Sequence, residues 1–270
     1  MEEIRYPAVA GAFYEDDKSK LSSTIDNFIK ETKPGKNIGV VSPHAGYVYS
    51  GKTAAAAINS LKGAKTFIIL GPNHTGIGAQ FSVMCKGVWR TPLGEIKIDD
   101  DIAFHLEKTG VVDNDSMAHL NEHSIEVQLP FLQKKFKGFS IVPISILNID
   151  YSANLLEKCI ELGKRIAEIA KKKDINIVAS SDFSHYIALE EAKEKDSKAV
   201  ENILSLDIKN FFAVLETMDA SVCGYAPIAV LMSAAKEMGL NTIEILHESS
   251  SGDVLRNYRS VVTYKAIGFR

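Results

Sequence analysis

The sequence predicts a single-domain α/β protein built on a central mixed, mostly parallel β-sheet. Short apolar runs rich in β-branched residues, at 39–42, 66–70 and 175–179, end abruptly in turn residues, as buried strands do. Segments with apolar residues at helical spacing alternate with these runs, which is the pattern of parallel βαβ units. The 270 residues contain no low-complexity tract, and a chain of this length buries roughly 75% of its unfolded surface. We therefore expect one domain that spans residues 1–270.

The first half of the chain is expected to begin irregularly and to continue with alternating helices and strands. Residues 1–16 form an extended, turn-rich lead-in, and apolar residues from Leu21 to Ile29 then recur at helical spacing. His44 and His74 end successive strands, and their separation of 30 residues matches one βαβ unit with its right-handed crossover. The expected elements are helix 17–31, a strand ending at 44, helix 51–61, strand 66–70, strand 81–84, an edge strand within 89–98, helix 99–108, a helical segment over 125–132 and strand 139–147.

The second half is expected to contain long helices and an antiparallel pair of strands that closes the sheet. Apolar residues at helical spacing predict an amphipathic helix over 152–171. Pro227 falls in the first turn of another predicted helix, where its missing N–H costs little. The other expected elements are strand 175–179, helices 190–204 and 208–216, a helix that opens at 223–227 and ends at 238, and strands 242–246 and 260–267 joined through 250–253.

Composition and charge exclude several classes of protein. The net charge of -3 and the pI of about 6.2 provide no electrostatic surface for nucleic acid, and the basic run 171–173 is short enough to be a solvated helix end. No run of about 18 apolar residues predicts a membrane span, and the N-terminus lacks the features of a signal peptide. The three cysteines are odd in number and far apart, which indicates a reducing compartment. We therefore expect a cytoplasmic protein that binds neither nucleic acid nor membrane.

Histidines stand where three of the predicted strands end. His44 and His74 each lie in a proline-containing turn after a strand, and strand 175–179 leads into Asp182 and His185. In an open α/β sheet, ligands bind in the crevice beyond the carboxyl ends of the strands. A single histidine often has a structural role, but three strand ends that deliver metal-ligating side chains to one edge describe a common site. The sequence therefore predicts a metal site at this edge.

Two residues are candidates for the third ligand beside His44 and His74. Asp182 would complete two histidines and one carboxylate, the set that suits non-haem Fe(II) and leaves positions open for substrate and oxygen. Cys223 would instead provide a thiolate, which favours zinc, Cu(I) or iron, and its expected place at a helix start would stabilise that thiolate. Its structural alternative is a small buried hydrophobe, the usual role of a free cysteine. The residues alone leave both ligand sets open.

His185, three residues after Asp182, has two alternative roles. It is either a further ligand or a general acid or base, for which a pKa near neutrality is suited. We favour the second role because the other candidate ligands already fill one side of a metal. The histidines at the remaining positions without a flanking signal, His105, His119 and His247, are expected to be surface or core residues.

Other polar side chains near the predicted site carry weaker signals. Glu122, His123 and Glu126 lie close together where a helix is expected to start. They either cap that helix or, in the case of His123, line the mouth of the pocket. Tyr47 and Tyr49 closely follow the first strand-end histidine and can present hydroxyl groups to a substrate, although a tyrosine after a turn usually packs. His123 and the two tyrosines are therefore candidate substrate-binding residues.

Five motifs, in this order, resemble the Memo family. They are 42–47 (SPHAGY), 70–74 (LGPNH), 122–126 (EHSIE), 180–185 (SSDFSH) and 223–224 (CG). The resemblance covers nearly the full chain, which makes it specific. Memo-like proteins resemble in fold the class III extradiol ring-cleaving dioxygenases, whose non-haem iron is held by two histidines and a glutamate beside a catalytic histidine. The resemblance thus implies a three-layer sandwich of the class III extradiol dioxygenase type.

The resemblance also implies roles for individual residues. His44 and His74 match the two iron histidines, and His185 matches the catalytic histidine. Cys223 stands where the dioxygenases have their glutamate, and a thiolate there changes the metal preference and is open to oxidation. Asp182 then becomes the nearest carboxylate, either as an extra ligand or as a group that orients an imidazole.

Three functions are consistent with these predictions. The first is a non-haem metal oxidoreductase, similar to a dioxygenase, that acts on a small molecule with Fe(II), or alternatively copper, as its cofactor; zinc is a further possible ion of the same site. Its metal would lie on His44, His74 and Cys223, and His185 would move a proton. The second is a metal-binding or peptide-binding module without turnover, and the third is a zinc hydrolase with Asp182 or His185 as base.

Overall fold

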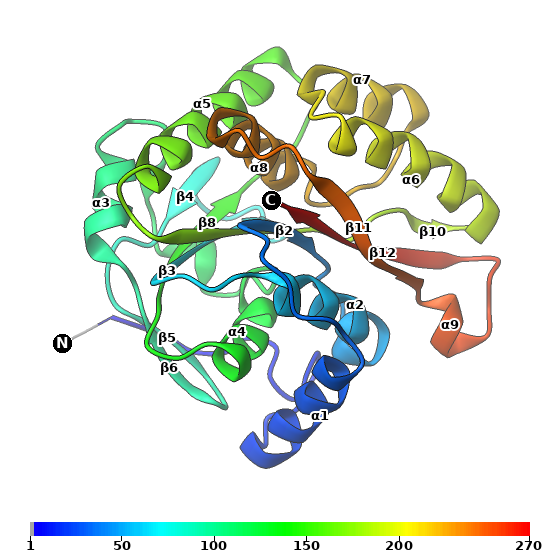
Figure 1. Ribbon diagram of the computed structural model, residues 1–270, viewed down its shortest axis with the longest axis horizontal. Helices are drawn as coiled ribbons and strands as arrows, with labels where there is room; N and C mark the ends of the chain where they lie inside the picture. Colours follow the sequence, from blue (N-terminus) through cyan, green and yellow to red (C-terminus); the bar gives the residue numbers. More distant parts are fainter. Residues whose placement is uncertain (1–2) are drawn as a thin grey trace.

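The computed structural model describes residues 3–270, so the first two residues of the predicted lead-in lie outside the described part of the chain. The strands of the main sheet are β2 (Gly39–Ser42), β3 (Thr66–Pro72), β4 (Phe81–Val83), β7 (Asp113–Asn114), β8 (Ser140–Ile146), β9 (Ile175–Ser180), β10 (His185–Ile187), β11 (Ile243–Ser250) and β12 (Val261–Phe269). Within the described residues they form one nine-stranded sheet in the order β10-β12-β2-β9-β3-β8-β4-β7, with β11 paired to β12. Helices pack on both faces of this sheet (Figure 1). The predicted three-layer α/β fold with a mixed sheet is confirmed.

The centre of the sheet is parallel and buried. β2 pairs with β9, β9 with β3, and β3 with β8, all in parallel register. Every residue of β2, β3 and β9 is buried, which explains why these strands are nearly continuous apolar runs in the sequence. β9 lies between β2 and β3, so the strands that lead to His44 and His74 flank the strand that leads to Asp182. Antiparallel strands complete the sheet on both sides, with β4 beside β8 and β12 beside β2.

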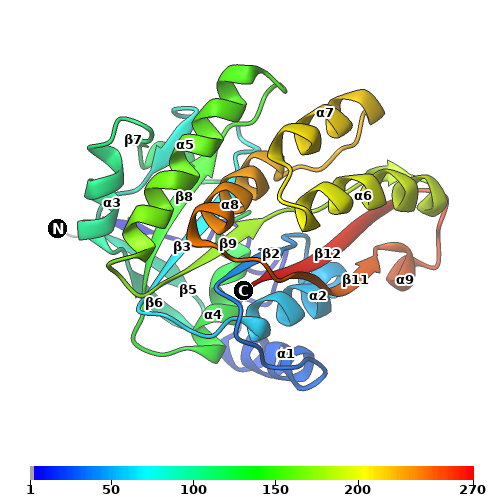
Figure 2. The same ribbon diagram turned by 45° about the horizontal axis from the view of Figure 1, so that its top comes forward.

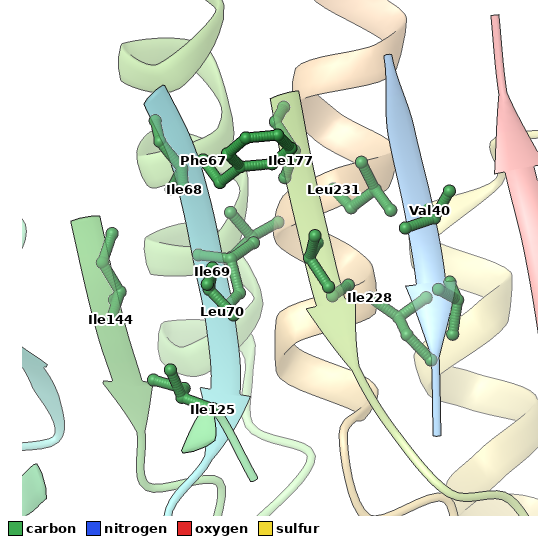
Figure 3. Packing of buried hydrophobic residues seen from close by; sticks show 14 of the residues in the cluster. Val40, Phe67, Ile68, Ile69, Leu70, Ile125, Ile144, Ile177, Ile228 and Leu231 are labelled. Carbon is green, nitrogen blue, oxygen red and sulfur yellow. The ribbon is translucent and has the colours of Figure 1, made fainter. Parts of the chain in front are cut away.

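Helices cover both faces of the main sheet. They are α1 (Lys18–Lys30), α2 (Tyr47–Ser60), α3 (Asp100–Glu107), α4 (Leu129–Lys135), α5 (Ala153–Ala170), α6 (Leu189–Leu204), α7 (Ile208–Met218), α8 (Tyr225–Met238) and α9 (Gly252–Leu255). α2 covers one face and contacts α1 and α4, whereas α8 covers the other face beside α5 (Figure 2). Ile228 and Leu231 of α8 lie beside the side chains of β2 and β9 (Figure 3). No helix among residues 3–270 is both long enough and apolar enough to cross a membrane.

Most predicted elements are confirmed within a few residues, and the exceptions have local causes. α2 begins at Tyr47, earlier than predicted, because the chain turns at Gly46 and enters the helix directly. The predicted helical segment 125–132 starts as a 3₁₀ turn, Glu126–Gln128, and becomes α-helical only in α4. Pro130, in the first turn of α4, has no N–H to donate to the preceding turn, which prevents one continuous helix. β10 occupies a segment that was predicted to be a loop.

A second, three-stranded sheet holds the N-terminal segment. β1 (Ile4–Arg5) pairs in parallel with β5 (Val88–Thr91), which pairs antiparallel with β6 (Gly94–Lys97). The predicted edge strand within 89–98 is therefore a hairpin outside the main sheet. Within the predicted extended, turn-rich lead-in, only Ile4 and Arg5 form a strand, and two residues are too few to give a pattern in the sequence.

Candidate metal centre

The carboxyl ends of β2, β3 and β9 meet at one edge of the sheet and bring three candidate residues together. His44 follows β2, His74 follows β3 and Asp182 follows β9. Cys223 comes from a distant part of the chain, the loop before α8. Gly224 allows this loop to approach, because a Cβ there would lie 2.2 Å from a backbone carbonyl oxygen at the end of β9. The parallel topology and one close backbone contact therefore assemble the predicted site.

His44, His74 and Cys223 form a compact group of possible metal ligands. Their ligand atoms all lie within 4.8 Å of one another, and His44 Nε2 lies 3.2 Å from Cys223 Sγ. The ring centroids of the two histidines are 5.2 Å apart. Burial lowers the pKa of His44 well below its usual value, so this imidazole is neutral and has a lone pair to donate. The donor types and their spacing suit zinc, copper or iron.

Hydrogen bonds fix which nitrogen of His44 carries the proton. The hydroxyl of Ser180 donates to the carbonyl oxygen of Ser124 (2.7 Å) and accepts from Gln128 Nε2 (2.9 Å). Because its single hydrogen is used, Ser180 Oγ can only accept from His44 Nδ1, which lies 2.9 Å away. The proton of His44 is therefore on Nδ1, and Nε2 faces Cys223 with a free lone pair.

A buried carboxylate, Glu122, orients His74 in the same way. Its Oε1 lies 3.0 Å from His74 Nδ1, and its Oε2 accepts the backbone N–H of His74 at 2.5 Å. Burial alone would raise the pKa of Glu122, but hydrogen bonding from His74 and the nearby imidazoles outweigh burial and hold this pKa at about 2. An ionised carboxylate only accepts, so His74 carries its proton on Nδ1. The predicted helix-capping role of Glu122 is wrong, because its other N–H donors, His123 and Ser124, belong to a turn before the helix.

His123 packs against both predicted metal histidines. Its ring stacks on His74 with the centroids 4.8 Å apart, and it lies edge-on to His44 at 5.5 Å and to Phe13 at 4.9 Å. His74, Glu122 and His123 also form a close group of possible ligands. Glu122 Oε1 already accepts two backbone N–H groups and faces His74 Nδ1, so we interpret this second group as support for His74.

The structure groups Cys223, and not Asp182, with the two histidines. Asp182 Oδ1 instead accepts the backbone N–H of His44 at 2.8 Å, and burial raises the pKa of this carboxyl to about 6. Burial, followed by the charge of Asp182, raises the pKa of Cys223 well above its usual value. Cys223 immediately precedes Gly224, the N-cap of α8, so it lies at a helix start as expected, but burial outweighs any stabilisation of the thiolate by the helix. A thiolate at this position needs a cation beside it.

His185 is anchored through both its backbone and its ring. Its N–H donates to Ser221 Oγ at 2.9 Å, and its Nδ1 lies 2.7 Å from the carbonyl oxygen of Ser221. A carbonyl oxygen only accepts, so Nδ1 again carries the proton and Nε2 is free. Ser221 is two residues before Cys223, which brings this histidine next to the group. The preceding residue, Ser184, is held by the buried carboxylate of Asp196 at 2.7 Å.

Comparison with known proteins identifies the family. A family model described as Memo-like protein matches residues 5–268. The chain belongs to this Memo-like family. A MEMO1 family protein from Sulfurisphaera tokodaii is 43% identical over 98% of this chain and 99% of its own, and one from Methanopyrus kandleri is 42% identical with the same coverage. An uncharacterized protein from Escherichia coli K12 is similar in fold, with a TM-score of 0.54 and 14% identity over 86% of this chain and 99% of that chain.

In this Memo-like chain the two tyrosines that follow the first strand differ in position. Tyr47 is 3% exposed, and its hydroxyl donates to the carbonyl oxygen of Val127 at 2.7 Å within the core. The hypothesis that Tyr47 presents its hydroxyl to a substrate is therefore wrong, because α2 starts at this residue and turns the side chain inward. Tyr49 is half-buried. Its side chain belongs to the first turn of α2, so the hypothesis that Tyr49 contacts a substrate stays a prediction.

A buried ion pair holds the loop of this Memo-like chain that carries Glu122. The guanidinium of Arg5 donates to the carboxylate of Glu126, and both side chains are fully buried. The same guanidinium donates to the backbone carbonyl oxygens of His119 at 3.0 Å and of Glu122 at 2.5 Å. Arg5 therefore links the loop that carries Glu122 and His123, on one side of the candidate metal site, to the small N-terminal sheet.

Glu126, the partner of Arg5, also binds the N-terminal segment directly. It accepts the hydroxyl of Tyr14 at 2.6 Å and two backbone N–H groups of the N-terminal segment, at 2.8 and 3.1 Å. Its predicted role as a helix cap is therefore wrong. The sequence analysis missed Arg5 because its partner is 121 residues away and no local pattern signals such a contact.

Proposed function

We propose that this protein is a metal-dependent oxidoreductase, similar to a dioxygenase, that acts on a small molecule. The observation that supports this best is the hydrogen bonding of His44, His74 and His185. Each imidazole has an acceptor at Nδ1, which leaves Nε2 as the nitrogen that can bind a metal or take a proton. The first two belong to the group that includes Cys223, whereas the third stands outside it. Metal binding and proton transfer are thus assigned to different imidazoles.

In this proposal, His44, His74 and Cys223 hold the metal ion. The donor set fits, because it combines two oriented imidazoles with a thiol whose ionisation a cation favours. Fe(II) is the proposed ion, and copper and zinc are alternatives that the same donors accept. When bound, Fe(II) or copper would supply Lewis acidity and redox chemistry at the strand ends, whereas zinc would supply Lewis acidity alone.

His185 is the proposed general acid or base. The carbonyl oxygen of Ser221 holds its Nδ1–H, so the ring is oriented and Nε2 can take a proton from the substrate and return it. Asp182 supports the site by holding the backbone N–H of His44. Two residues are proposed to contact the substrate: His123, whose ring stacks on His74, and Tyr49, in the first turn of α2.

A metal-binding or peptide-binding module without turnover is the second candidate. The thiol of Cys223 favours it, because a thiolate ligand suits zinc and Cu(I) and is open to oxidation in the presence of oxygen. This candidate predicts tight metal binding that does not depend on His185. Both candidates need a reducing environment, and we propose the cytoplasm, where the three free cysteines stay thiols.

Oxygen uptake by anaerobically prepared, Fe(II)-loaded protein tests the proposal, with a panel of phenols as substrates. We expect uptake by the wild type, and uptake reduced about 100-fold or more in His185→Gln with unchanged iron content, because that variant loses only the proton carrier. Cys223→Ala should lose iron, whereas Cys159→Ala, the matched control at a buried thiol outside the site, should keep it. Tight iron binding without uptake would favour the binding module. A wild type that binds no metal would contradict both candidates.

A further inference from the structure

Tyr186 combines two unfavourable features at one position next to His185. Its φ is +59°, in the left-handed region, where a residue with a Cβ is strained and glycine is favoured. Its side chain is also 78% exposed, so a large aromatic ring faces water. Strained residues persist only where surrounding structure holds them, and they gather at functional sites. The two features together indicate a role outside the packing of the fold.

The left-handed backbone brings the ring of Tyr186 beside His185. Neighbouring residues of a regular strand point to opposite faces of the sheet. Here the pairing of β10 with β12 shifts register between His185 and Ile187, and Tyr186 lies at the shift. The ring centroids of Tyr186 and His185 are 5.9 Å apart, at an interplanar angle of 62°. The strained residue therefore shares the side of the strand on which the proposed acid or base lies.

Two further tyrosines lie on the same side of the strand ends. Tyr49 comes from α2 and Tyr264 from β12, and Tyr264 is almost fully buried. Burial raises the pKa of Tyr264, and the charge of Asp182 and the phenols of Tyr49 and Tyr186 add to this effect. Of these three tyrosines, Tyr264 is buried and Tyr186 is the exposed one.

The strand itself does not require tyrosine at this position. His185 and Ile187 make the pairings with β12, and residue 186 only joins them. Glycine would adopt the same backbone without strain and would expose no apolar ring to water. The aromatic side chain therefore costs stability at this position, and a ligand contact would offset that cost.

We infer that Tyr186 is a specificity-determining residue that packs its ring against a flat aromatic ring of the substrate beside His185. The inference rests on the proposed function, because it uses the same site, and it names the substrate class as aromatic small molecules. Aromatic rings attract each other in offset or edge-to-face geometry, and covering an exposed ring removes apolar surface from water. An aliphatic molecule with the same metal-binding oxygens would gain neither the attraction between rings nor the burial of the exposed tyrosine ring.

Equilibrium dialysis of the full-length, zinc-loaded protein against two chelators tests the inference. The probes are 4-nitrocatechol, which has a flat ring, and acetohydroxamate, which offers two oxygens without a ring. We expect Tyr186→Gly to bind 4-nitrocatechol roughly tenfold more weakly, while its affinity for acetohydroxamate stays within about twofold. Tyr186→Phe keeps the ring and should bind both probes within about twofold of the wild type. Equal losses for the two probes, no loss, or a wild type that does not bind 4-nitrocatechol would overturn the inference.

A stability measurement separates ligand contact from a structural role. Arg256 has nearly the same backbone conformation, with φ of +54°, and is exposed, so Arg256→Gly is the matched control for relief of strain. We expect the melting temperatures of Tyr186→Gly and Arg256→Gly to equal or exceed that of the wild type. A fall in the melting temperature of Tyr186→Gly alone would make the tyrosine structural and overturn the inference.

Metal content, measured on the same samples, keeps the two proposals distinguishable. A wild type that binds neither zinc nor Fe(II) would contradict the proposed function. In that case the affinities of Tyr186→Gly and Tyr186→Phe for 4-nitrocatechol still decide the role of the ring. If the wild type binds metal but Tyr186→Gly and Tyr186→Phe bind 4-nitrocatechol equally, only the role of Tyr186 is overturned and the proposed function stands.

Discussion

His44, His74 and Asp182 stand at the ends of three adjacent buried strands, so the backbone hydrogen bonds of a parallel sheet determine where they lie. Glu122 and His123 face them from a loop without regular structure, which depends on a few polar contacts to the N-terminal segment. The strand side is supported by the regular backbone hydrogen bonds of the sheet, whereas the loop side depends on side-chain contacts between distant residues, among them one buried ion pair. Substitutions that affect the two sides should therefore differ in size and in what they change.

The largest effect is expected from breaking the ion pair on the loop side. Arg5→Met leaves the carboxylate of Glu126 buried without its partner, and we expect the free energy of unfolding to fall by about 3–5 kcal/mol. Urea unfolding measures this change. Arg90→Met is the control, because Arg90 pairs with Glu95 at the exposed surface, and we expect at most about 1 kcal/mol there. Similar losses in the two variants would mean that the loop does not depend on Arg5.

A smaller effect, on metal affinity, is expected where the loop side contacts the strand side. Glu122→Gln removes the charge that holds the Nδ1–H of His74, and we expect metal affinity to fall about 10–100-fold. Competition with a chelating dye measures this affinity. Glu157→Gln, on the exposed face of α5, is the control and should leave affinity unchanged. An affinity within twofold of the wild type would show that the strand side alone orients His74.

The pH dependence of the free energy of unfolding should also depend on a residue of the loop side, His119. Burial, followed by the charge of Arg5, lowers the pKa of His119 to about 4, against the opposing effects of Asp115, the Ser82 backbone and Glu122. The unfolded chain, with an ordinary histidine pKa of about 6.5, binds the proton more readily, so stability present above pH 6.5 is lost as the pH falls toward 4.

The lost stability can be assigned to His119 by comparison with a variant. Between pH 7 and pH 5 the neutral, buried His119 accounts for a loss of about 2 kcal/mol in the free energy of unfolding. We expect His119→Met to lose that much less than the wild type over this range, as measured by urea unfolding at each pH. His105→Asn, at an exposed histidine, should follow the wild type. If His119→Met also follows the wild type, another group causes the acid sensitivity.

The strand side could be predicted from the sequence. An apolar run predicts each strand, and the histidine or aspartate that follows the run is the candidate ligand. His44, His74 and Asp182 were located in this way, and the order of the strands, with β9 in the middle, only brought them closer together. Cys223 was one of two alternatives for the third ligand, and a close contact at Gly224 brings it to the group.

The loop side could not be predicted, because its determinants are contacts between distant residues. Nothing local to Arg5 indicates that it reaches Glu126, and Glu122 resembled a helix cap because the 3₁₀ turn was expected to be α-helical. Tyr47 was misplaced for a related reason, since the start of α2 decides whether its hydroxyl faces the core or the site. The left-handed backbone at Tyr186 could not be predicted either, because nothing in the identity of a tyrosine indicates that conformation.

The tethering of the ring nitrogens bears on how ions come and go. Because Ser180 and Glu122 already aim the imidazoles of His44 and His74, an arriving ion would meet these two donors in place. Competing ions would then be sorted by affinity and abundance rather than by the time the protein takes to reshape itself. We expect occupancy to follow the supply of metal, so one scaffold can serve hosts that handle different metals.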